Sequence, residues 1–301
     1  MAKKKKSKKK SKKSSKLTSF LLIVILIAGL SLMLYPKFAD YWNSLHQSRA
    51  IAAYSDAVAA VDNSQNEAML AAARDFNSRI HLRSNIYELS DEEREEYNSV
   101  LDITGTGIMG YVEIPSIKVE LPVYHGTSEG VLQIATGHLE WTGLPVGGEG
   151  NHTVLSGHRG LPSAKLFSDL DQLIEGDVFL IRVLNEIFTY EVDQILIVLP
   201  EDVSALAPVS GRDYCTLVTC TPYGINSHRM LVRGHRIANA ETAKTLTVVN
   251  EATLVDTKLV AGALAIPILF VLLMVSTFSE SHDRRRRRIM KEIRRENRFH
   301  E

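Results

Sequence analysis

The sequence predicts a mainly β domain that lies between two membrane-spanning helices. Three observations support this fold class: an apolar run near each end, strongly basic segments outside both runs, and a middle section of short β-type runs separated by glycine and proline. The chain of 301 residues has room for one or two domains. The β-type section from Gly107 to Ala238, about 130 residues, is long enough for one closed core.

Two apolar runs predict membrane anchors. Residues 17–35 contain no charge, and residues 259–278 are interrupted only by Gly262 and Pro267. Roughly 20 apolar residues span the hydrocarbon core of a bilayer. A cleaved signal peptide is the alternative for the first run, but its 19 residues exceed the usual signal core, and its end lacks a small-x-small cleavage site. We therefore expect two transmembrane helices, one over each run.

The formal net charge of zero hides an uneven distribution of charge. Residues 3–16 hold ten lysines and no acid, and residues 284–298 hold nine basic groups. Because each basic run adjoins an apolar run, it indicates membrane topology and not nucleic-acid binding. Cationic flanks stay on the cytoplasmic side of a membrane. We therefore expect cytoplasmic tails at 1–16 and 279–301, with the section 37–257 on the extracellular side.

Helical patterns precede the β section. Alanine-rich sequence with a sparse apolar stripe predicts helix over residues 38–83, with a break at 62–64 where good N-cap residues stand. Ser90 followed by Glu93 is a capping-box pattern, which predicts a further short helix. We expect the section 37–103 to form either a helical stalk or an arm that lies over the next domain.

Short β-type runs follow, and their number and spacing predict an all-β barrel or sandwich over residues 104–238. Short helical pieces are expected at 129–135 and 164–173, and a linker is expected at 239–257. No internal repeat is visible. The predicted strands are 108–114, 119–124, 153–155, 178–183, 188–199, 215–219 and 230–238.

The chain has two cysteines, Cys215 and Cys220. If both lie on one strand, about 16 Å separates them, whereas a disulfide needs Cα atoms within about 7 Å. We therefore expect no disulfide between them. Cys220 ends its β-type run just before Pro222, which places it at a strand end. A thiol there can act as a nucleophile when a base lies nearby. Cys215, in contrast, is predicted to be a small buried side chain.

Ten histidines are candidates for that base. His158 follows a predicted strand and a glycine turn, which again places a side chain at a strand end. His138, His152, His228 and His235 occupy comparable turn or strand settings, and structural roles explain each of them equally well.

Arg229 opens the strand that follows Cys220. An arginine there could hold a carbonyl or an oxyanion by charge and hydrogen bonds, although an ordinary solvated strand residue would look the same. Spacing alone therefore gives a hypothesis of Cys220, His158 and Arg229 acting together. No metal-site spacing and no phosphate-binding glycine loop appears, so we expect no cofactor and no metal.

At these positions the sequence resembles the sortases, the membrane-anchored cysteine transpeptidases of Gram-positive bacteria. The signature is the run Thr-Leu-Val-Thr-Cys at 216–220, followed nine residues later by Arg229, with Val232 and Gly234 completing it. A second matching motif is Leu-Ser-Gly-His-Arg at 155–159. Because separate motifs occur in the order typical of the family, the resemblance is specific.

The resemblance extends over roughly residues 100–238. Further similarity covers 107–115 and the Leu-Pro-Val-Gly-Gly run at 144–148. The amino-acid sequence of residues 220–229, together with a second anchor, resembles that of the pilin-polymerising class C enzymes. The resemblance implies an eight-stranded sortase-type β-barrel with short helices, preceded by N-terminal helices and flanked by the two transmembrane helices.

The resemblance also implies roles for three residues. Cys220 would attack the Thr–Gly bond of an LPxTG-type sorting signal and form a thioacyl-enzyme, with only a minority of molecules holding a Cys220 thiolate beside a protonated His158. His158 would act as general acid and base, and Arg229 would position the signal and stabilise the oxyanion. A lysine amine of a pilin subunit would accept the acyl group. The expected partners are therefore pilins, sorting signals and the cell membrane, but no nucleic acid.

Class C sortases commonly carry a lid with an Asp-Pro-aromatic motif before the barrel. Residues 79–97 contain no proline and no such triplet, so we predict a more accessible cleft.

Two other functions stay open. A housekeeping sortase would attach surface proteins to a peptidoglycan precursor, although such enzymes usually have only the N-terminal anchor, and a non-catalytic, membrane-tethered domain could serve as a scaffold.

Overall fold

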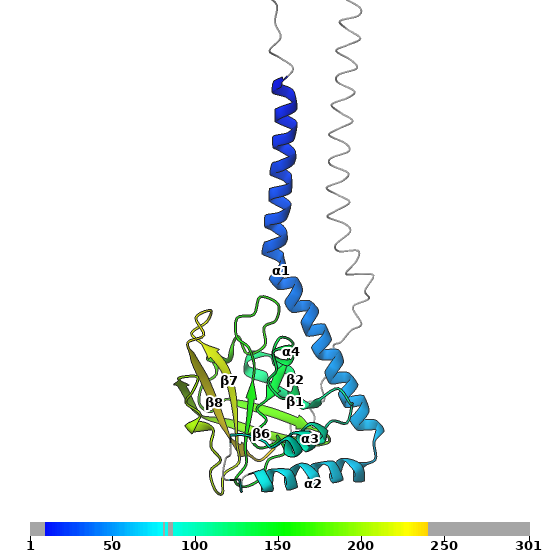
Figure 1. The fold of residues 1–301 in the computed structure, drawn as a ribbon, viewed down its shortest axis with the longest axis vertical. Coiled ribbons are helices and arrows are strands. Elements are labelled where there is room, and N and C mark those ends of the chain that lie inside the picture. The colour runs from blue at the N-terminus through cyan, green and yellow to red at the C-terminus, as the bar shows by residue number, and fades with distance from the viewer. Residues whose placement is uncertain (1–9, 81, 84–86, 240–301) are drawn as a thin grey trace, which may run out of the picture. The chain divides into compact units, whose positions relative to one another are not determined.

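The computed structural model of the protein describes residues 10–80, 82–83 and 87–239. Three helices precede the β section: α1 (Lys10–Ala60), α2 (Asn63–Ile80) and α3 (Asp91–Ser99). Figure 1 shows α1 in blue as the longest of them. The second expected anchor at 259–278, the C-terminal tail, almost all of the expected linker and the first nine residues lie outside the described residues.

Eight strands form a closed barrel in the order β1-β2-β3-β4-β7-β8-β6-β5 (Figure 1). The pairs β2–β3 and β4–β7 are parallel, and the other neighbouring pairs are antiparallel. The strands are β1 (Ile108–Ile114), β2 (Val119–His125), β3 (Thr136–His138), β4 (His152–Ser156), β5 (Val178–Val183), β6 (Glu186–Val198), β7 (Tyr214–Thr221) and β8 (His228–Ile237). The short helices are α4 (Glu129–Leu132) and the 3-10 turns η1 (Pro115–Ile117), η2 (Leu170–Gln172) and η3 (Ser204–Leu206).

The closed eight-stranded barrel with short helices is the fold that the resemblance implied, and it decides between the barrel and the sandwich that the strand pattern left open. One strand, β3, was missed, because its three residues are too few to show a β pattern and it is defined only by pairing with β2 and β4. The predicted helix at 164–173 was wrong apart from η2. Leu166 has a φ of +40°, in the left-handed region that interrupts a right-handed helix.

The helices before the barrel pack as an arm against it and not as a free stalk. Phe76 of α2 and Tyr97 of α3 are buried in the same apolar cluster as the barrel side chains, together with Leu70 and Leu101. Each such side chain contributes roughly 1.5–3 kcal/mol by leaving water. The predicted break lies between α1 and α2, and the predicted capping box of Ser90 and Glu93 begins α3.

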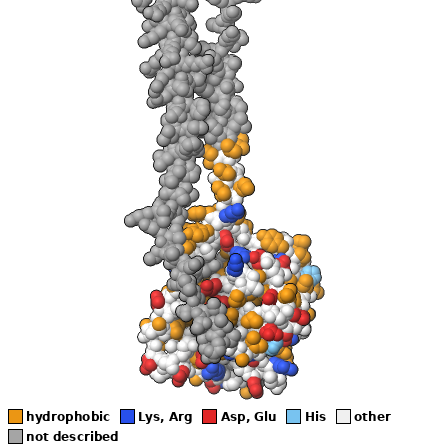
Figure 2. Space-filling model, turned by 180° about the vertical axis from the view of Figure 1, so that it is seen from behind, with side chains coloured by type: hydrophobic (Ala, Val, Ile, Leu, Met, Phe, Trp, Pro, Cys, Tyr) orange, Lys and Arg blue, Asp and Glu red, His pale blue; other side chains and the backbone are white. Residues whose placement is uncertain are grey.

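Helix α1 has two parts with different surroundings. It continues through Pro36, so the first expected anchor and the start of the expected stalk form one helix. Its later part packs on the barrel, where the Tyr54 hydroxyl donates to the Met109 carbonyl at 3.1 Å and accepts from the Leu184 N–H at 2.6 Å. Its earlier part exposes apolar side chains such as Leu26 and Met33. Figure 2 shows a stretch of apolar side chains, in orange, on the part of the helix that extends away from the barrel. This part is long and apolar enough to cross a membrane.

Candidate active site

The pairing of β7 with β8 sets Cys220 directly opposite Arg229. Directly opposed residues of an antiparallel pair project to the same face of the sheet, and alternate residues along each strand share that face. Cys220 and Arg229 therefore lie side by side with Val218 and Leu231. Strand β7 ends at Thr221, immediately before Pro222, which confirms the expected position of Cys220 near a strand end.

Strand β4 runs parallel to β7, so the two strands end at the same end of the barrel. Ser156 is in register with Val218. Beyond it, the Gly157 N–H donates to the Val218 carbonyl at 3.0 Å, and the Thr219 hydroxyl donates to the Gly157 carbonyl at 2.7 Å. Gly157 is the residue before His158, and Thr219 is the residue before Cys220, so this contact brings the His158 loop to the end of the barrel where Cys220 lies.

A close approach fixes the residue before His158 as glycine. A Cβ atom on Gly157 would lie 2.7 Å from the buried ring of Phe167. The Phe167 N–H also donates to the His158 carbonyl at 3.1 Å. The loop that carries His158 is therefore held to the barrel on both sides of the histidine.

The His158 side chain is mostly buried, with 26% of it exposed. Its Nε2 atom has no hydrogen-bond partner among the described residues. Oε1 of Glu129, at the start of α4, lies 3.8 Å from Nε2, within ion-pair range but beyond hydrogen-bond range. This buried nitrogen is thus not occupied by a protein hydrogen bond among the described residues, as a proton-exchanging group requires.

Three of the competing histidines are held elsewhere. His138 is completely buried, contacts the Tyr97 hydroxyl through Nδ1 and the Gly143 carbonyl through Nε2, and burial lowers its pKa to about 3. His152 is buried against Thr216, and His235 is paired with Tyr214 at the far end of β7.

His228 shares the Cys220 end of the barrel, opposite Thr221. As the immediate neighbour of Arg229 in the strand, it projects to the other face. His158 is therefore the candidate base that the strand geometry favours.

Arg229 and Arg233 lie on the same face of β8 but have different partners. Arg233 binds Asp193 through two hydrogen bonds, of 2.9 and 3.0 Å, and stacks over Tyr214. Arg229 donates through Nη1 only to the carbonyls of Asn226 and His228, and in the described part of the chain it has no ion pair with a carboxylate. Its charge is thus available to a carbonyl or oxyanion beside Cys220.

The two cysteines are both free thiols, as expected, but their environments differ. Cys215 is completely buried in the barrel core, and burial raises the pKa of its thiol. Cys220 is partly exposed. Because the thiolate is the nucleophilic form, only Cys220 is placed to act as a nucleophile.

Arg159 is a site residue that sequence reasoning missed. Its Nη1 donates to the Thr221 hydroxyl at 3.3 Å, it forms an ion pair with Asp171, and its guanidinium lies 5.8 Å from the ring centroid of Tyr223. It thus ties the His158 loop to the end of the cysteine strand. The sequence signal was its position directly after His158, inside the second matching motif.

An apolar surface adjoins the cysteine and the arginine. Val218 and Leu231, on their face, belong to a cluster with Trp141 and with Leu196 and Val198 of β6. Val198 is directly opposite Arg229. Leu231 is buried within this cluster, whereas Val218 and Val198 are partly exposed and can contact apolar side chains of an extended peptide. In the described residues no group of three His, Cys, Asp or Glu side chains could hold a metal ion.

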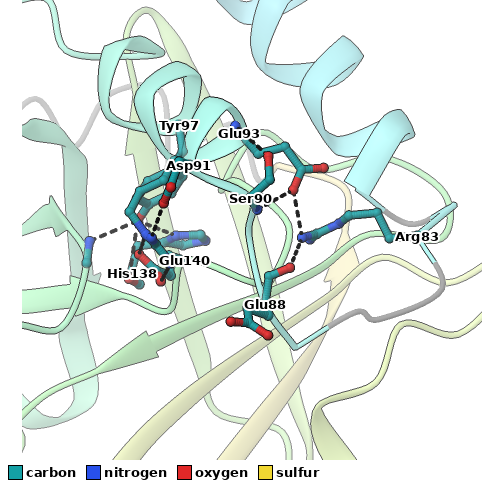
Figure 3. A network of polar contacts seen from close by, with 10 residues as sticks. Arg83, Glu88, Ser90, Asp91, Glu93, Tyr97, His138 and Glu140 are labelled. Atoms are coloured by element: carbon teal, nitrogen blue, oxygen red, sulfur yellow. Dashed lines mark hydrogen bonds and ion pairs between the residues drawn. The ribbon is translucent and has the colours of Figure 1, made fainter.

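The stretch expected to contain a lid is only partly described, since residues 81 and 84–86 lie outside the described residues. Beyond it, Tyr87 packs edge-on against Trp141, with ring centroids 5.2 Å apart. Figure 3 shows the network that follows, in which Arg83 contacts the Glu88 carbonyl and Glu93, while Tyr97 contacts His138. The accessible cleft stays a prediction.

A family model described as the sortase domain matches residues 112–237. Among solved structures, the crystal structure of sortase C1 from Streptococcus agalactiae is 51% identical, with a TM-score of 0.62, and the match covers 64% of this chain and 100% of that one. The chain belongs to the sortase family.

Other relatives agree with this assignment. Sortase C from Streptococcus pneumoniae is 43% identical over 64% of this chain and 97% of that chain, with a TM-score of 0.57. The curated sortase A of Streptococcus agalactiae is 30% identical over 117 residues, which are 38% of this chain and 47% of that relative. This chain therefore spans about half the length of that curated relative.

Proposed function

We propose that this sortase is a membrane-anchored cysteine transpeptidase of class C that cleaves an LPxTG-type sorting signal between Thr and Gly. It transfers the signal to a lysine amine of a pilin subunit and so polymerises pili. The observation that carries the proposal is the convergence of Cys220, Arg229 and the His158 loop at one end of the barrel. The class follows from the similarity to sortase C structures.

In the first half of the reaction, the sulfur of Cys220 attacks the Thr carbonyl of the signal. The resulting oxyanion is stabilised by Arg229, whose charge has no carboxylate partner among the described residues. His158 protonates the departing Gly amine as the C–N bond breaks, which leaves a thioester on Cys220.

In the second half, a lysine amine attacks the thioester. His158 takes a proton from this amine, the C–S bond breaks, and an isopeptide bond forms. The partly exposed side chains of Val218 and Val198 would contact the apolar residues of the signal beside the cysteine. No cofactor takes part in either step.

The proposed location follows from α1 and from the sequence beyond the described residues. The exposed apolar part of α1 would anchor the protein in the cell membrane of a Gram-positive bacterium. With a second anchor at 259–278, both basic tails would lie in the cytoplasm and the barrel outside. Cysteine accessibility from each side of intact membrane vesicles, measured on single cysteines placed in each tail, tests this topology.

The test of the activity supplies a sorting-signal peptide and two acceptors, a lysine side chain in a pilin segment and a peptidoglycan-type amine. We expect transfer to the pilin lysine, and we expect Cys220→Ala to abolish it. Preferred transfer to the peptidoglycan-type amine would favour a housekeeping sortase. Pilus polymer formed by the Cys220→Ala protein would favour a non-catalytic scaffold.

A further inference from the structure

The side chain of Arg159 joins three segments at the end of the barrel where Cys220 lies. Only 8% of this side chain is exposed. Its Nη1 donates to the Thr221 hydroxyl at 3.3 Å, its Nε donates to the Ser168 carbonyl at 3.3 Å, and its Nη2 forms an ion pair with Asp171. A planar guanidinium carries its donors in a rigid fork, so it holds several partners in one geometry. The end of β7, the loop after β4 and the η2 turn are therefore held to one another.

Hydrogen bonds join the His158 segment to strand β7 on both sides of the proposed catalytic pair. The residue before His158 is hydrogen-bonded to the residue before Cys220. The residue after His158, Arg159, is hydrogen-bonded to the residue after Cys220, Thr221. A contact on one side alone would leave the two segments free to pivot about it. The contact made by Arg159 therefore completes the fixed relation between the segments that carry the pair.

The loop that follows Cys220 packs against the same arginine. The Arg159 guanidinium lies 5.8 Å from the ring centroid of Tyr223, and a Cβ atom on Gly160 would lie 3.1 Å from that ring. Gly160 has a φ of +79°, a backbone conformation that favours glycine. The Tyr223 ring therefore packs directly on the backbone two residues beyond His158. The β7–β8 loop is thus attached to the His158 segment through the arginine and the glycine that follows it.

We propose that Arg159 is a positioning residue of the transpeptidase, which fixes the imidazole of His158 relative to the sulfur of Cys220 and so sets the rate of proton transfer. It acts through the two segments that it joins and not on the substrate. General acid–base catalysis needs its partners within hydrogen-bond reach, and a misplacement of about 1 Å can cost about 100-fold in rate. This inference rests on the proposed function, because it takes His158 and Cys220 as the reacting pair.

Arg182 serves as a matched control on the other side of the barrel. It lies on β5, which is four strands from β4 and three from β7 in the barrel order. Its side chain is 12% exposed, and its Nε donates to Glu113 at 2.6 Å. Substituting either arginine by alanine removes a mostly buried cation from its carboxylate partner, so both variants should be less stable than the wild type. Only the loss of Arg159 should also change the chemistry of the site.

The first test measures alkylation of Cys220 by iodoacetamide in the full-length protein at a series of pH values. It needs no sorting signal. The wild type and His158→Ala should differ in the pH profile of this rate, because a neighbouring histidine assists loss of the thiol proton. We expect the profile of Arg159→Ala to move to that of His158→Ala, and the profile of Arg182→Ala to match the wild type. A wild-type profile in Arg159→Ala, or one profile shared by the wild type and His158→Ala, would overturn the inference.

The second test measures acylation by a sorting-signal peptide in a single turnover. We expect Arg159→Ala to lower the maximal rate about 100-fold, with little change in the peptide concentration that gives half of that rate. Arg159→Lys keeps a charge for Asp171 but lacks the fork that also reaches Thr221, so we expect a loss of about tenfold. Arg182→Ala should stay within about twofold of the wild type. Added methylguanidinium should restore part of the rate in Arg159→Ala alone, because it can occupy the space of the missing guanidinium.

Equal losses of rate in Arg159→Ala and Arg182→Ala would overturn the inference, since they would indicate general damage to the fold. An unchanged rate in Arg159→Ala would also overturn it. If Arg159→Ala does not fold, Thr221→Val takes its place, because it removes one hydroxyl at nearly constant size. We expect this variant to slow acylation about threefold, and an unchanged rate would contradict the inference. A wild type that shows the His158-dependent alkylation profile but cleaves no sorting signal would overturn the proposed function and not the positioning of the pair.

Discussion

The two ends of the β7–β8 pair contain the same kinds of residue in opposite states. At one end, Cys215 is buried in the core and Arg233 is held by Asp193. At the other end, Cys220 is partly exposed and Arg229 contacts only backbone carbonyls among the described residues. Burial and a carboxylate partner make the first pair structural, whereas their absence makes the second pair available for chemistry. Residue type alone therefore does not define this site.

The histidines show the same contrast. His138 has both ring nitrogens in contact with protein groups, and its burial favours the neutral form. His158 has an Nε2 atom with no hydrogen-bond partner in the part of the chain that the structure describes. Substitutions at the two ends should therefore differ in their effects on activity and on stability, which makes the division between a structural end and a reactive end of the barrel testable.

The largest effect on the cleavage rate should come from substituting Cys220, and the same substitution at Cys215 serves as its control. Cys220→Ala should lower the cleavage rate of a sorting-signal peptide by roughly 10⁴-fold or more, because the nucleophile is lost. Cys215→Ala should keep the rate and lower the free energy of unfolding by roughly 1 kcal/mol, because it leaves a small void in the core. Peptide cleavage and urea unfolding measure the two effects. Loss of cleavage in Cys215→Ala with an intact fold would contradict this division.

The two arginines of β8 form the next matched pair. Arg229→Ala should lower kcat/KM by about 10²–10³-fold, which is the usual cost of removing an oxyanion donor. Arg233→Lys keeps a positive charge near Asp193 and should change kcat/KM by no more than about twofold while lowering stability slightly. Steady-state kinetics with the same peptide measure kcat/KM for both variants. Similar losses in both variants would mean that β8 is sensitive as a whole.

His138 predicts a dependence of stability on pH. Its pKa is lowered to about 3 from an ordinary value of 6.5, so below pH 6.5 the unfolded chain binds a proton that the folded chain does not. Stability should therefore fall as the pH drops from 6.5 towards 3, by about 2 kcal/mol at pH 5.

The matched variant for this effect is His138→Gln, whose amide can accept from Tyr97 and donate to Gly143 without titrating. Urea unfolding at pH 7 and pH 5 should show a smaller loss for this variant than for the wild type. The same loss in both proteins would assign the acid sensitivity to other groups.

The smallest effect concerns access to Cys220. Tyr87→Ala removes the ring that packs on Trp141, and Tyr87→Phe keeps it. An aromatic pair is worth about 0.5–1.5 kcal/mol, and Tyr87 is itself 47% exposed. We expect alkylation of Cys220 to rise about threefold or less in Tyr87→Ala. A rise of well over tenfold would mean that this stretch closes the cleft as a lid does.

Residues before the barrel cannot simply be removed to make the same measurement. Phe76 and Tyr97 belong to the core cluster of the barrel, so a protein that starts near Thr104 would lose part of that core. Single substitutions test access to the cleft without this damage.

The sequence predicted what depends on local pattern. Runs such as 108–114 and 178–183 match β1 and β5 residue for residue, because their alternation and flanking turns are local signals. The capping box at Ser90 was predictable for the same reason, because it joins two residues only three positions apart. Strand β3 was missed because pairing with distant partners defines it, and Arg159 was missed because its contacts with Asp171 and Thr221 span loops that only the fold brings together.

For the site, the sequence placed Cys220 near a strand end and singled out His158, but its turn and strand pattern alone did not exclude the other histidines, and the resemblance to the sortases made that choice. His138 and His158 follow similar patterns of turn and strand residues. Only the parallel pairing of β4 with β7, between segments 62 residues apart in the chain, brings His158 and not His138 to the end where Cys220 lies. Strand pattern and spacing carry no information on long-range register of this kind, so without the family motif at 155–159 the choice of His158 would have stayed open.

We expect Cys220, and not Cys215, to carry the acyl group of a cleaved sorting signal. The direct test is to mix the full-length protein with a sorting-signal peptide, stop the reaction with acid, and locate the added mass by mass spectrometry of the digested chain. We predict an acyl group on Cys220, as a thioester that hydroxylamine removes. Cleavage of the peptide with no acyl adduct on Cys220, or with the adduct on another residue, would contradict the account.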